Sequence, residues 1–391
     1  MLAQILLICI PMKILAIDDQ QLILLSVEKR LKEIGYDVLT ANSGKAGIEL
    51  FNSFKPDLVL VDINMPDMSG LDVVRYIRVF RKSNTPVLIM SGNTDEKIIV
   101  DGFTLGVNDF MKKPISLNEM AARIKRIIGA PEANQIATKK NTTPRMLQKN
   151  CVGVVIPCYN EENRLSNDLF EDFAHNNLGY HLCFVDDGST DKTLEVLEKL
   201  QKTNVNNISV YKCDKNGGKA EAVRQGILHL AKDTQFDYIG FLDADLSTDF
   251  RDFDDLVKTI ETSEFKIVSG SRIARMGANI TKESARKIIS MTINLIIQTI
   301  LGMPFKDTQC GAKIMDREIA TTMFNEKFIT KWLFDVEIFM RMRRHYGKAN
   351  AKKLICEQPL KRWIHADGSK LSMTDSLKIA GQLAKIAYAY R

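Results

Sequence analysis

Zinc-binding and disulfide patterns are missing from this sequence of 391 residues. Its seven cysteines are scattered without a Cys-x-x-Cys pair, and its five histidines add no ligand spacing. These absences argue against a zinc site and a disulfide framework, and they favour a reducing cytosol. The sequence also lacks a GxxxxGK[ST] phosphate loop and any ATP-binding signature, which argues against a P-loop enzyme and a histidine kinase.

A long apolar run is missing as well. The opening MLAQILLICIP is apolar but lacks a basic start and a cleavage site, and it is too short to span a bilayer. Whether residues 1–11 are native stays open, because Met12 directly precedes a natural strand. The longest later apolar stretch, residues 288–303, contains Thr292, Asn294, Gln298 and Thr299. We therefore expect a cytoplasmic protein whose membrane contact, if it has one, is peripheral, at the inner face of the cell membrane.

Charge is unevenly distributed along the chain. The net charge of +6 combines +1 over residues 1–130, −8 over 131–265 and +13 over 266–391. The basic last third is a candidate surface for anionic lipid or phosphate. We expect no nucleic-acid partner, because the sequence shows no recognition motif and few aromatic residues among the basic ones.

Residues 12–128 alternate short apolar strands with amphipathic helical stretches. Five strand–helix units of this kind predict a doubly wound parallel sheet, with helices over residues 21–34, 44–54, 70–80, 97–105 and 117–128. The length of the chain, at about 150 residues per domain, allows two or three units in total.

Polar groups follow the strands of this first domain. Asp18 and Asp19 follow the first strand, Asp62 the third and Ser91 the fourth, and Lys113 lies just beyond the fifth. The carboxyl ends of parallel strands meet at one edge, so these groups should share a crevice. Three carboxylates there repel one another unless a divalent cation lies among them, and a cation with a lysine would neutralise an acyl phosphate.

This constellation resembles the receiver domain of two-component response regulators, which has a flavodoxin-like (βα)5 fold, and the resemblance covers residues 12–128. It implies that Asp18 and Asp19 are the acidic pair, Asp62 accepts the phosphoryl group and the carbonyl of Asn64 helps hold Mg²⁺. It further implies switch positions at Ser91, Phe110 and Lys113, where Lys113 precedes a usually cis Pro114. A sensor histidine kinase is the implied partner. The alternative is a receiver fold that has lost phosphotransfer.

Residues 131–149 are polar, free of aromatic residues and interrupted twice by proline. This composition predicts a linker between a domain at 1–130 and a second domain at 150–391. If flexible, a chain of this length spans roughly 25 Å, which would let the receiver dock or swing away.

The second domain centres on FLDADLST, residues 241–248, where an apolar run ends in two acids. If the strand continues, Asp243 and Asp245 point to one face and can converge on one cation. Such a pair suits Mg²⁺ or Mn²⁺ carrying a diphosphate. A solvated loop with a helix cap is the alternative reading of this motif alone.

Three further strand ends carry polar groups. Tyr159 and Glu161 follow the strand that ends near Pro157, Asp187 follows a second strand, and Gly217-Gly218-Lys219 opens a helix. Glycine permits close approach to a ligand, and amides at a helix start favour anions. Taken alone, the Gly-Gly-Lys turn is more typical of a plain loop. With Asp243 and Asp245, these groups could line one nucleotide site.

The motifs VVIPCYNEEN, VDDGSTD, NGGKAEAVRQGI and FLDADLST resemble the inverting glycosyltransferases of family 2, which have the GT-A fold. The resemblance implies that Pro157, Tyr159, Glu161 and Asp187 contact the nucleotide of the donor. It implies that Asp243 and Asp245 hold the sugar nucleotide and its metal. Lys219, in the matching NGGK motif, is assigned to the donor with them.

Later segments narrow the resemblance to dolichyl-phosphate β-glucosyltransferases and related polyprenyl-phosphate glycosyltransferases, over about residues 151–375. These segments are SGSRIAR, KDTQCGAKIM, WLFDVEIF and EQPLKRWIHADGSKLS. The resemblance implies that Arg272 and Arg286 bind the acceptor phosphate. Asp307 is a candidate base, and its alternative is a structural carboxylate paired with Lys306 or an arginine.

Two amphipathic stretches have two readings each. Residues 288–303 could rest on a membrane with Asn294 and Gln298 toward the protein, or could form a core helix. Residues 376–391 could bind a lipid surface or pack on the domain.

These observations predict a phosphorylation-regulated, metal-dependent transferase that moves a sugar, UDP-glucose being the favoured donor, to a polyprenyl phosphate. Two rivals remain open: transfer to a polysaccharide or protein, and a non-catalytic module that binds sugar nucleotides. Whether the receiver pairs with the transferase or with a second receiver in a homodimer is also open.

Overall fold

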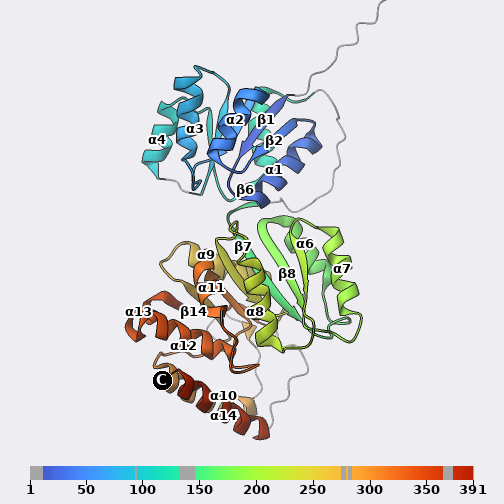
Figure 1. Ribbon diagram of the computed structural model, residues 1–391, viewed down its shortest axis with the longest axis vertical. Helices are drawn as coiled ribbons and strands as arrows, with labels where there is room; N and C mark the ends of the chain where they lie inside the picture. Colours follow the sequence, from blue (N-terminus) through green and yellow to red (C-terminus); the bar gives the residue numbers. More distant parts are fainter. Residues whose placement is uncertain are drawn as a thin grey trace, which may run out of the picture. The chain divides into compact units, whose positions relative to one another are not determined.

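The computed structural model describes residues 12–92, 95–131, 146–273, 279–280, 284–363 and 373–390. The chain divides into two compact units (Figure 1). The first runs to Cys151 and includes Ala174–Tyr180, and the second comprises Val152–Phe173 and the chain from His181 onward. Most of the predicted linker, residues 132–145, lies outside the described residues.

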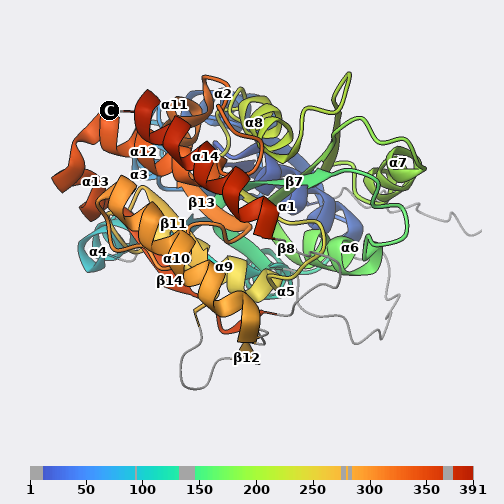
Figure 2. The same cartoon turned by 90° about the horizontal axis from the view of Figure 1, so that it is seen from below.

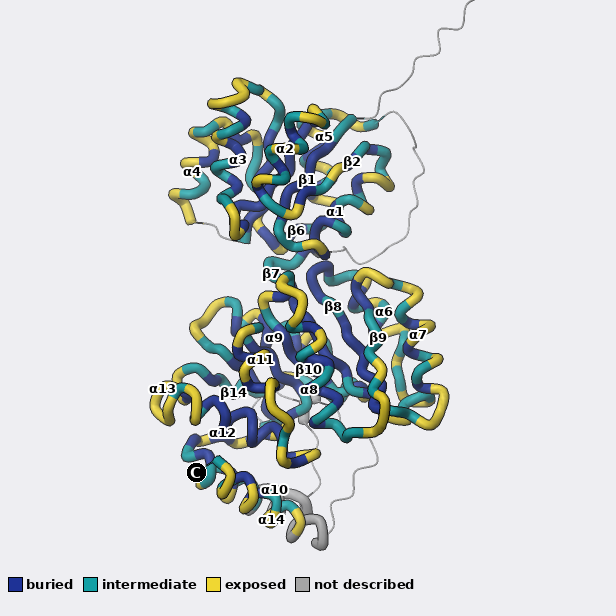
Figure 3. The backbone as a smooth tube through the Cα atoms, viewed as in Figure 1, coloured by how far each residue is buried: buried dark blue, intermediate teal, exposed yellow. Residues whose placement is uncertain are grey.

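The first unit contains the predicted parallel sheet, in the order β2-β1-β3-β4-β5. Its strands are β1 (Lys13–Ile17), β2 (Asp37–Ala41), β3 (Leu58–Asp62), β4 (Val87–Ser91) and β5 (Asp109–Lys112). Every residue of β3 and β4 is buried, as expected for strands covered on both faces. The neighbouring strand β1 is also buried except at its first residue (Figure 3). The doubly wound fold predicted from the sequence is confirmed.

Five helices connect these strands near their predicted positions. They are α1 (Gln21–Ile34), α2 (Gly44–Phe54), α3 (Gly70–Arg75) with its continuation η1 (Tyr76–Phe80), α4 (Glu96–Thr104) and α5 (Leu117–Ile128). Side-chain oxygens of Ser43, Ser69, Asp95 and Ser116 cap four of them by accepting backbone amides. A short strand, β6 (Ile115–Ser116), pairs antiparallel with Met146 and Leu147 within the same unit.

The second sheet has the order β14-β11-β13-β10-β7-β8-β9. Its strands are β7 (Met146–Cys158), β8 (Asn177–Asp186), β9 (Ile208–Lys212), β10 (Tyr238–Leu242), β11 (Ile267–Ser271), β13 (Ala312–Asp316) and β14 (Ile355–Pro359). β10 runs parallel to β7, whereas β13 is antiparallel to both β10 and β11. β12 (Asn279–Ile280) and β15 (Arg362–Trp363) form a separate two-stranded sheet. This mixed sheet is the predicted GT-A fold.

Helices cover this sheet and bring distant segments together. They are α6 (Asn167–Asn176), α7 (Thr193–Thr203), α8 (Lys219–Leu230), α9 (Phe250–Glu261), α11 (Arg317–Phe324), α12 (Phe334–Tyr346) and α13 (Lys348–Leu354). Two further helices, α10 (Ser284–Leu301) and α14 (Met373–Ala389), lie side by side (Figure 2). Within the described part of the chain, no helix is both long and apolar enough to cross a membrane.

The two amphipathic helices use one face each for packing. On α10, Asn294 donates to the carbonyl of Lys306 at 2.7 Å and Gln298 donates to that of Phe305 at 2.6 Å, so both point toward the protein as predicted. Ile297 is buried on the same helix, while Leu295 is 64% exposed. α14 packs against α10 and buries Leu383 and Ile386. α10 therefore packs on the protein through one face, as a core helix would, and exposes an apolar residue on another, as a helix resting on a membrane would.

Candidate functional site

The predicted acidic crevice of the first unit is closed around a lysine. The ammonium nitrogen of Lys113 lies 2.7 Å from a carboxylate oxygen of Asp18 and 2.9 Å from one of Asp62. All three side chains are buried. Burial lowers the pKa of Lys113, but the charges of Asp18 and Asp62 outweigh it and raise that pKa well above its ordinary value. The lysine therefore stays charged.

Asp62 lies at the end of β3, where one of its carboxylate oxygens pairs with Lys113 and the other accepts a backbone amide. Its Oδ2 accepts the amide of Asn64 at 2.7 Å. Burial raises the pKa of Asp62 to about 6, and the neighbouring charge of Asp18 adds to this, while Lys113 opposes it. Gly70 is required close by, because a side chain there would overlap the carbonyl oxygen of Asp62.

The other predicted receiver residues lie at the same edge or beside it. Ser91 is fully buried at the end of β4, and its carbonyl accepts the amide of Lys113 at 2.8 Å. Asp19 is half-buried directly after Asp18. Phe110, on β5, packs partly buried against the apolar core, and the Lys113–Pro114 peptide is cis. The structure thus brings together the residues that the motif spacing singled out.

In the second unit, the central pair is Lys219 and Asp243. The lysine starts α8, the aspartate follows β10, and their charged atoms are 2.5 Å apart. Burial lowers the pKa of Lys219, but the charges of Asp243 and Asp335 raise it above its ordinary value, with a smaller contribution from Asp245. Asp243 lies against Gly311, where any Cβ would overlap the carboxylate. Gly311 belongs to the quoted KDTQCGAKIM segment, but no local pattern indicated that it would lie beside Asp243, 68 positions earlier.

Asp187 fixes the turn that presents Lys219. Its two oxygens accept the amides of Gly217 and Gly218, each at 2.8 Å, and its own amide donates to the carbonyl of Cys158 at the end of β7. Burial raises the pKa of Asp187, while the two amides oppose that shift. The Gly-Gly-Lys motif is therefore an anchored turn, and Gly218 adopts a positive φ of 85° there.

The prediction of how the two acids of FLDADLST converge was wrong in its geometry. β10 ends at Leu242, and residues 243–246 form a turn in which the amide of Leu246 donates to the carbonyl of Asp243. Asp245 is exposed, and one of its oxygens accepts the amide of Ser247 at 2.9 Å. The charges of Asp245 and Asp243 both raise the pKa of Glu161, although burial is the larger cause. The three acids therefore share one electrostatic neighbourhood.

The remaining donor candidates line the end of β7. Pro157 is half-buried in the strand, and Tyr159 is 45% exposed just after it. The amide of Glu161 donates to the hydroxyl of Thr193 at 2.8 Å, which holds this loop on the start of α7.

A buried ion pair lies behind Lys219, and its two residues belong to the KDTQCGAKIM and WLFDVEIF segments, where the sequence analysis gave them no role. Lys313 of β13 is fully buried, with its nitrogen 2.7 Å from a carboxylate oxygen of Asp335 at the start of α12. Burial raises the pKa of Asp335, while Lys313 and Lys219 oppose that shift. The two lysines and the two aspartates Asp243 and Asp335 form one alternating charge cluster.

Arg272 and Asp307 pair with each other, which is the structural alternative given for Asp307. Arg272 donates from its Nε and a terminal nitrogen to the two oxygens of Asp307 at 2.7 and 2.8 Å. Although burial raises the pKa of Asp307, Arg272 lowers it below its usual range, so the carboxylate is a poor proton acceptor. The side chain of Arg286 lies outside the described residues.

The protein alone does not enclose a metal ion in the described part of the chain, where no group of three or more His, Cys, Asp or Glu has suitable geometry. In the second unit, Asp243 and Asp245 still fit a Mg²⁺ or Mn²⁺ ion, since such ions commonly take one or two carboxylates and complete their coordination with substrate phosphates. In the first unit, Asp18, Asp19, Asp62 and the carbonyl of Asn64 would be the ligands. Burial is the main cause of the raised pKa of Asp62, and a cation at this edge would stabilise the charged form of the carboxylate.

Comparison with known proteins identifies both domains. Family models match a response regulator receiver domain at residues 14–125 and glycosyl transferase family 2 at residues 153–324. The dolichyl-phosphate beta-glucosyltransferase of Dictyostelium discoideum is 31% identical over 254 residues, which cover 61% of this chain and 74% of that protein. This chain belongs to the family 2 glycosyltransferases.

The receiver domain precedes this glycosyltransferase in the same chain. The cell cycle transcriptional regulator CtrA of Caulobacter vibrioides is 40% identical over 117 residues, covering 30% of this chain and half of that protein. Among solved structures, glucosyl-3-phosphoglycerate synthase from Mycobacterium tuberculosis resembles 62% of this chain and 80% of that one, with 19% identity and a TM-score of 0.45. The resemblances predicted from sequence are confirmed for both domains.

Proposed function

We propose that this glycosyltransferase moves a hexosyl group from a nucleotide sugar, with UDP-glucose favoured, to a polyprenyl phosphate. The observation that carries the proposal is the Lys219–Asp243 pair at the end of β10, beside Asp245 and Glu161. In this arrangement the ammonium group of Lys219 can bind a diphosphate, and the neighbouring carboxylates can bind a metal ion. The choice of glucose and of a lipid phosphate rests on the names of relatives such as the Dictyostelium enzyme.

Donor binding would use the anchored turn. The Asp187 carboxylate holds Gly217 and Gly218 so that Lys219 faces the carboxylates after β10. A diphosphate entering beside Lys219 would compete with Asp243 for its ammonium group. Asp243 would then be released to orient the donor and its metal. A bound Mg²⁺ or Mn²⁺ would neutralise the leaving diphosphate, and Asp243 and Asp245 are the residues that would hold it.

The transfer step needs positioning more than proton removal. A lipid phosphate is already ionised, so its oxygen can attack the anomeric carbon as the bond to the diphosphate breaks, which inverts the configuration there. Lys219 stabilises the charge that develops on the leaving group. The low pKa of Asp307 agrees with a mechanism that needs no strong base.

The acceptor would approach from the membrane. Leu295 and Ile296 are exposed on α10, and the chain from residue 266 onward has a net charge of +13. An apolar ridge within a basic region can bind an anionic membrane surface reversibly. We infer peripheral attachment at the inner face of the cell membrane, with the remainder of the protein in the cytoplasm.

A neutral acceptor, such as a polysaccharide or protein glycan, is the second candidate. The observation that favours it is the two-point hydrogen bonding of Arg272 to Asp307, which already neutralises the arginine assigned to the acceptor phosphate. A lipid phosphate would have to share Arg272 with Asp307, whereas a hydroxyl acceptor would not.

Regulation would start at Asp62. We infer that a sensor histidine kinase phosphorylates Asp62 and that Lys113 then pairs with the phosphoryl group in place of the free carboxylate. The acyl phosphate would alter the receiver surface, either toward the transferase or toward a second receiver in a homodimer, and so gate access of donor or lipid.

Transfer assays with purified protein test the activity. Radiolabelled nucleotide sugars would be combined with short polyprenyl phosphates or soluble glycans, with and without Mn²⁺. We expect metal-dependent labelling of the lipid from UDP-glucose, and a loss of about 10²- to 10³-fold in Asp243→Asn. The control is Asp316→Asn, which alters an aspartate paired with Lys266 on the same domain.

Other outcomes separate the rivals. Label in the glycan and none in the lipid would support the second candidate. Binding of nucleotide sugar without transfer or hydrolysis under every condition would instead indicate a non-catalytic binding module.

A further inference from the structure

The chain ends near a buried polar network that includes the hydroxyl of Tyr390. This hydroxyl accepts a hydrogen bond from Nε of Arg341 at 2.9 Å and donates one to a carboxylate oxygen of Glu337 at 3.2 Å. Arg341 and Glu337 lie one turn apart on α12, and both are buried. Tyr390 directly follows α14, so the end of that helix is tied to the middle of the second unit.

Both α12 residues hold the backbone of one segment, residues 323–331. Glu337 is fully buried and accepts the amides of Ile329 and Thr330, each at 2.9 Å, as well as the Thr330 hydroxyl at 2.8 Å. Arg341 donates to the carbonyls of Met323, Glu326 and Lys327 at 2.5 to 2.8 Å. A segment with no regular structure after Phe324 is thus fixed by charged groups.

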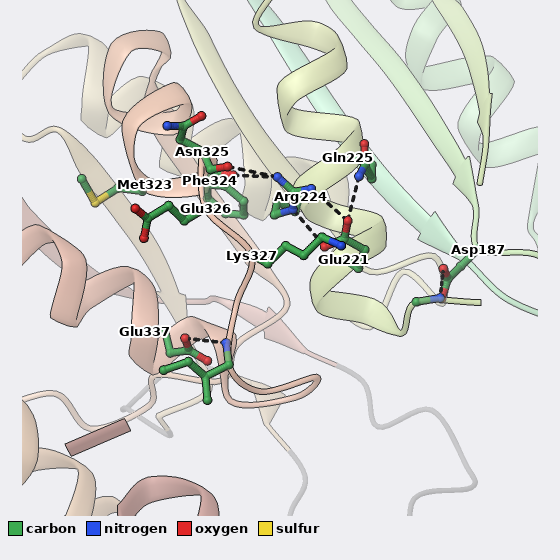
Figure 4. Close-up of polar contacts among 12 residues, drawn as sticks. Asp187, Glu221, Arg224, Gln225, Met323, Phe324, Asn325, Glu326, Lys327 and Glu337 are labelled. Atoms are coloured by element: carbon green, nitrogen blue, oxygen red, sulfur yellow. Dashed lines mark hydrogen bonds and ion pairs between the residues drawn. The ribbon is translucent and has the colours of Figure 1, made fainter. Parts of the chain in front are cut away.

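The same segment contacts the turn that presents Lys219. The carbonyl of Lys331 accepts the amide of Ala220 at 3.3 Å, and a Cβ added to Gly218 would lie 3.2 Å from the side chain of Lys331. Arg224 of α8 donates to the carbonyls of Phe324 and Asn325 (Figure 4). The segment therefore lies between the Tyr390 network and the first turns of α8.

We propose that Tyr390 is a positioning residue for the nucleotide-sugar site. Its hydroxyl completes the network of Glu337 and Arg341, this network sets the path of residues 323–331, and that path sets the Gly217-Gly218-Lys219 turn. The docked end of α14 thereby controls how Lys219 meets the donor diphosphate. This inference deepens the proposed function and rests on it for the identity of the ligand.

The chemistry of the hydroxyl explains why a tyrosine is needed. A phenylalanine would keep the ring and its packing but would remove the acceptor for Nε of Arg341 and one donor to Glu337. Buried charged groups that lose a partner rearrange to find another. The segment is what those groups hold, so its backbone should loosen while the rest of the fold is retained.

Tyr390→Phe in the full-length protein tests the proposal, with Tyr388→Phe as the matched control, since Tyr388 lies on the same helix and is 80% exposed. We expect the KM for the nucleotide sugar to rise about three- to tenfold in Tyr390→Phe, because part of the free energy of the two lost hydrogen bonds reaches the Lys219 turn. The KM for the acceptor should stay close to wild type, and the protein should still unfold cooperatively at a moderately lower midpoint. Hydrogen exchange should accelerate at the amides of residues 329–330 and 217–218.

Thr330→Val is the second variant, because it removes the hydroxyl bond from the segment side of the same network. It should reproduce both the donor KM change and the exchange pattern. Equal donor KM and equal exchange in Tyr390→Phe and Tyr388→Phe would overturn the proposal, as would faster exchange at 329–330 without any change at 217–218. A further outcome is that the protein and its variants all fail to transfer a nucleotide sugar while Tyr390→Phe, unlike Tyr388→Phe, exchanges faster at both sites. That result would support the network and refute only the proposed transfer.

Discussion

Asp243 can take its position because residue 311 has no side chain. The Gly311 backbone lies beside Asp243, and its carbonyl accepts the amide of Asp243 at 3.1 Å, so carboxylate and backbone are fixed together. The ion pair with Lys219 depends on that arrangement. A single methyl group at residue 311 would therefore displace the carboxylate without touching the apolar core.

Gly311→Ala should reduce transfer at least about 100-fold, because it moves a group that stabilises charge at the reacting centre. Initial-rate assays with wild type as reference measure this effect. Gly381→Ala is the control, since nothing lies within 4 Å of an added Cβ there. Equal rates for the two variants would contradict the role given to Asp243.

His181 makes the second unit sensitive to acid. Its ring nitrogens lie 2.7 Å from the hydroxyl of Ser209 and 3.3 Å from the carbonyl of Asn206. Burial lowers the pKa of His181 to about 4 from its ordinary 6.5. Between about pH 4 and 6.5 the imidazole of His181 is therefore protonated in the unfolded chain and neutral in the folded chain. The stability that is present above pH 6.5 is lost as the pH falls toward 4.

The free energy of unfolding should fall by about 3 kcal/mol over this range through His181 alone. Urea unfolding followed by tryptophan fluorescence measures it selectively, because both tryptophans, Trp332 and Trp363, belong to the second unit. His181→Gln should flatten the pH dependence, and the exposed His345→Gln should retain it. A steep dependence that persists in His181→Gln would assign it to other groups.

At the scale of elements, α10 depends on a neighbouring helix for its end. Arg343 of α12 donates to the carbonyls of Ile300 at 2.9 Å and Leu301 at 3.1 Å, which have no helical partner of their own. A cation at this position also interacts favourably with the helix dipole. α12 therefore anchors α10 at one end and the segment 323–331 at the other.

Arg343→Met should lower the free energy of unfolding of the second unit by about 1–2 kcal/mol, because it removes charged hydrogen bonds and keeps most of the apolar stem. The tryptophan signal again provides the measurement. Arg344→Met, at the exposed neighbouring position, should change stability by less than about 0.5 kcal/mol. If both variants lose the same free energy of unfolding, the hydrogen bonds from Arg343 to the end of α10 make no specific contribution to stability.

At the scale of the whole molecule, the fusion of a receiver domain to an enzyme predicts a phosphorylation site at Asp62. Asp62 is buried against Lys113, and the resemblance to receiver domains implies that its carboxylate accepts the phosphoryl group. A small acyl phosphate such as acetyl phosphate, supplied with Mg²⁺, should label the wild-type protein and fail to label Asp62→Asn. Label that resists hydroxylamine, or label in Asp62→Asn, would exclude this aspartate as the acceptor.

Phosphorylation should then change the rate of transfer. We expect wild type treated with acetyl phosphate to differ from untreated protein at least about twofold when lipid vesicles are present, the response to a modest change in population of two states. Asp62→Asn should not respond. Identical turnover in all of these samples would refute gating of the transferase by phosphorylation of the receiver.

The doubly wound fold and most residues of each candidate site could be predicted from local patterns, whereas the GT-A fold was predicted from the resemblance to family 2 glycosyltransferases. Asp18, Asp62, Asp187 and Asp243 each follow an apolar run, and parallel strands bring such ends to one edge. The Gly-Gly-Lys motif taken alone favoured a plain loop, and the fold shows that Asp187 anchors it. The error concerned Asp243 and Asp245, since strand periodicity was extended past Leu242 into a turn.

The sequence by itself determined which residues stand at strand ends, because the spacing of apolar runs and acids is local information. Only the tertiary structure decided how those residues are held. Gly311 against Asp243, Lys313 with Asp335, Arg272 with Asp307 and Tyr390 with Glu337 join residues that are distant along the chain. Such pairs leave no periodic signal, since burial and charge select them only after the chain has folded.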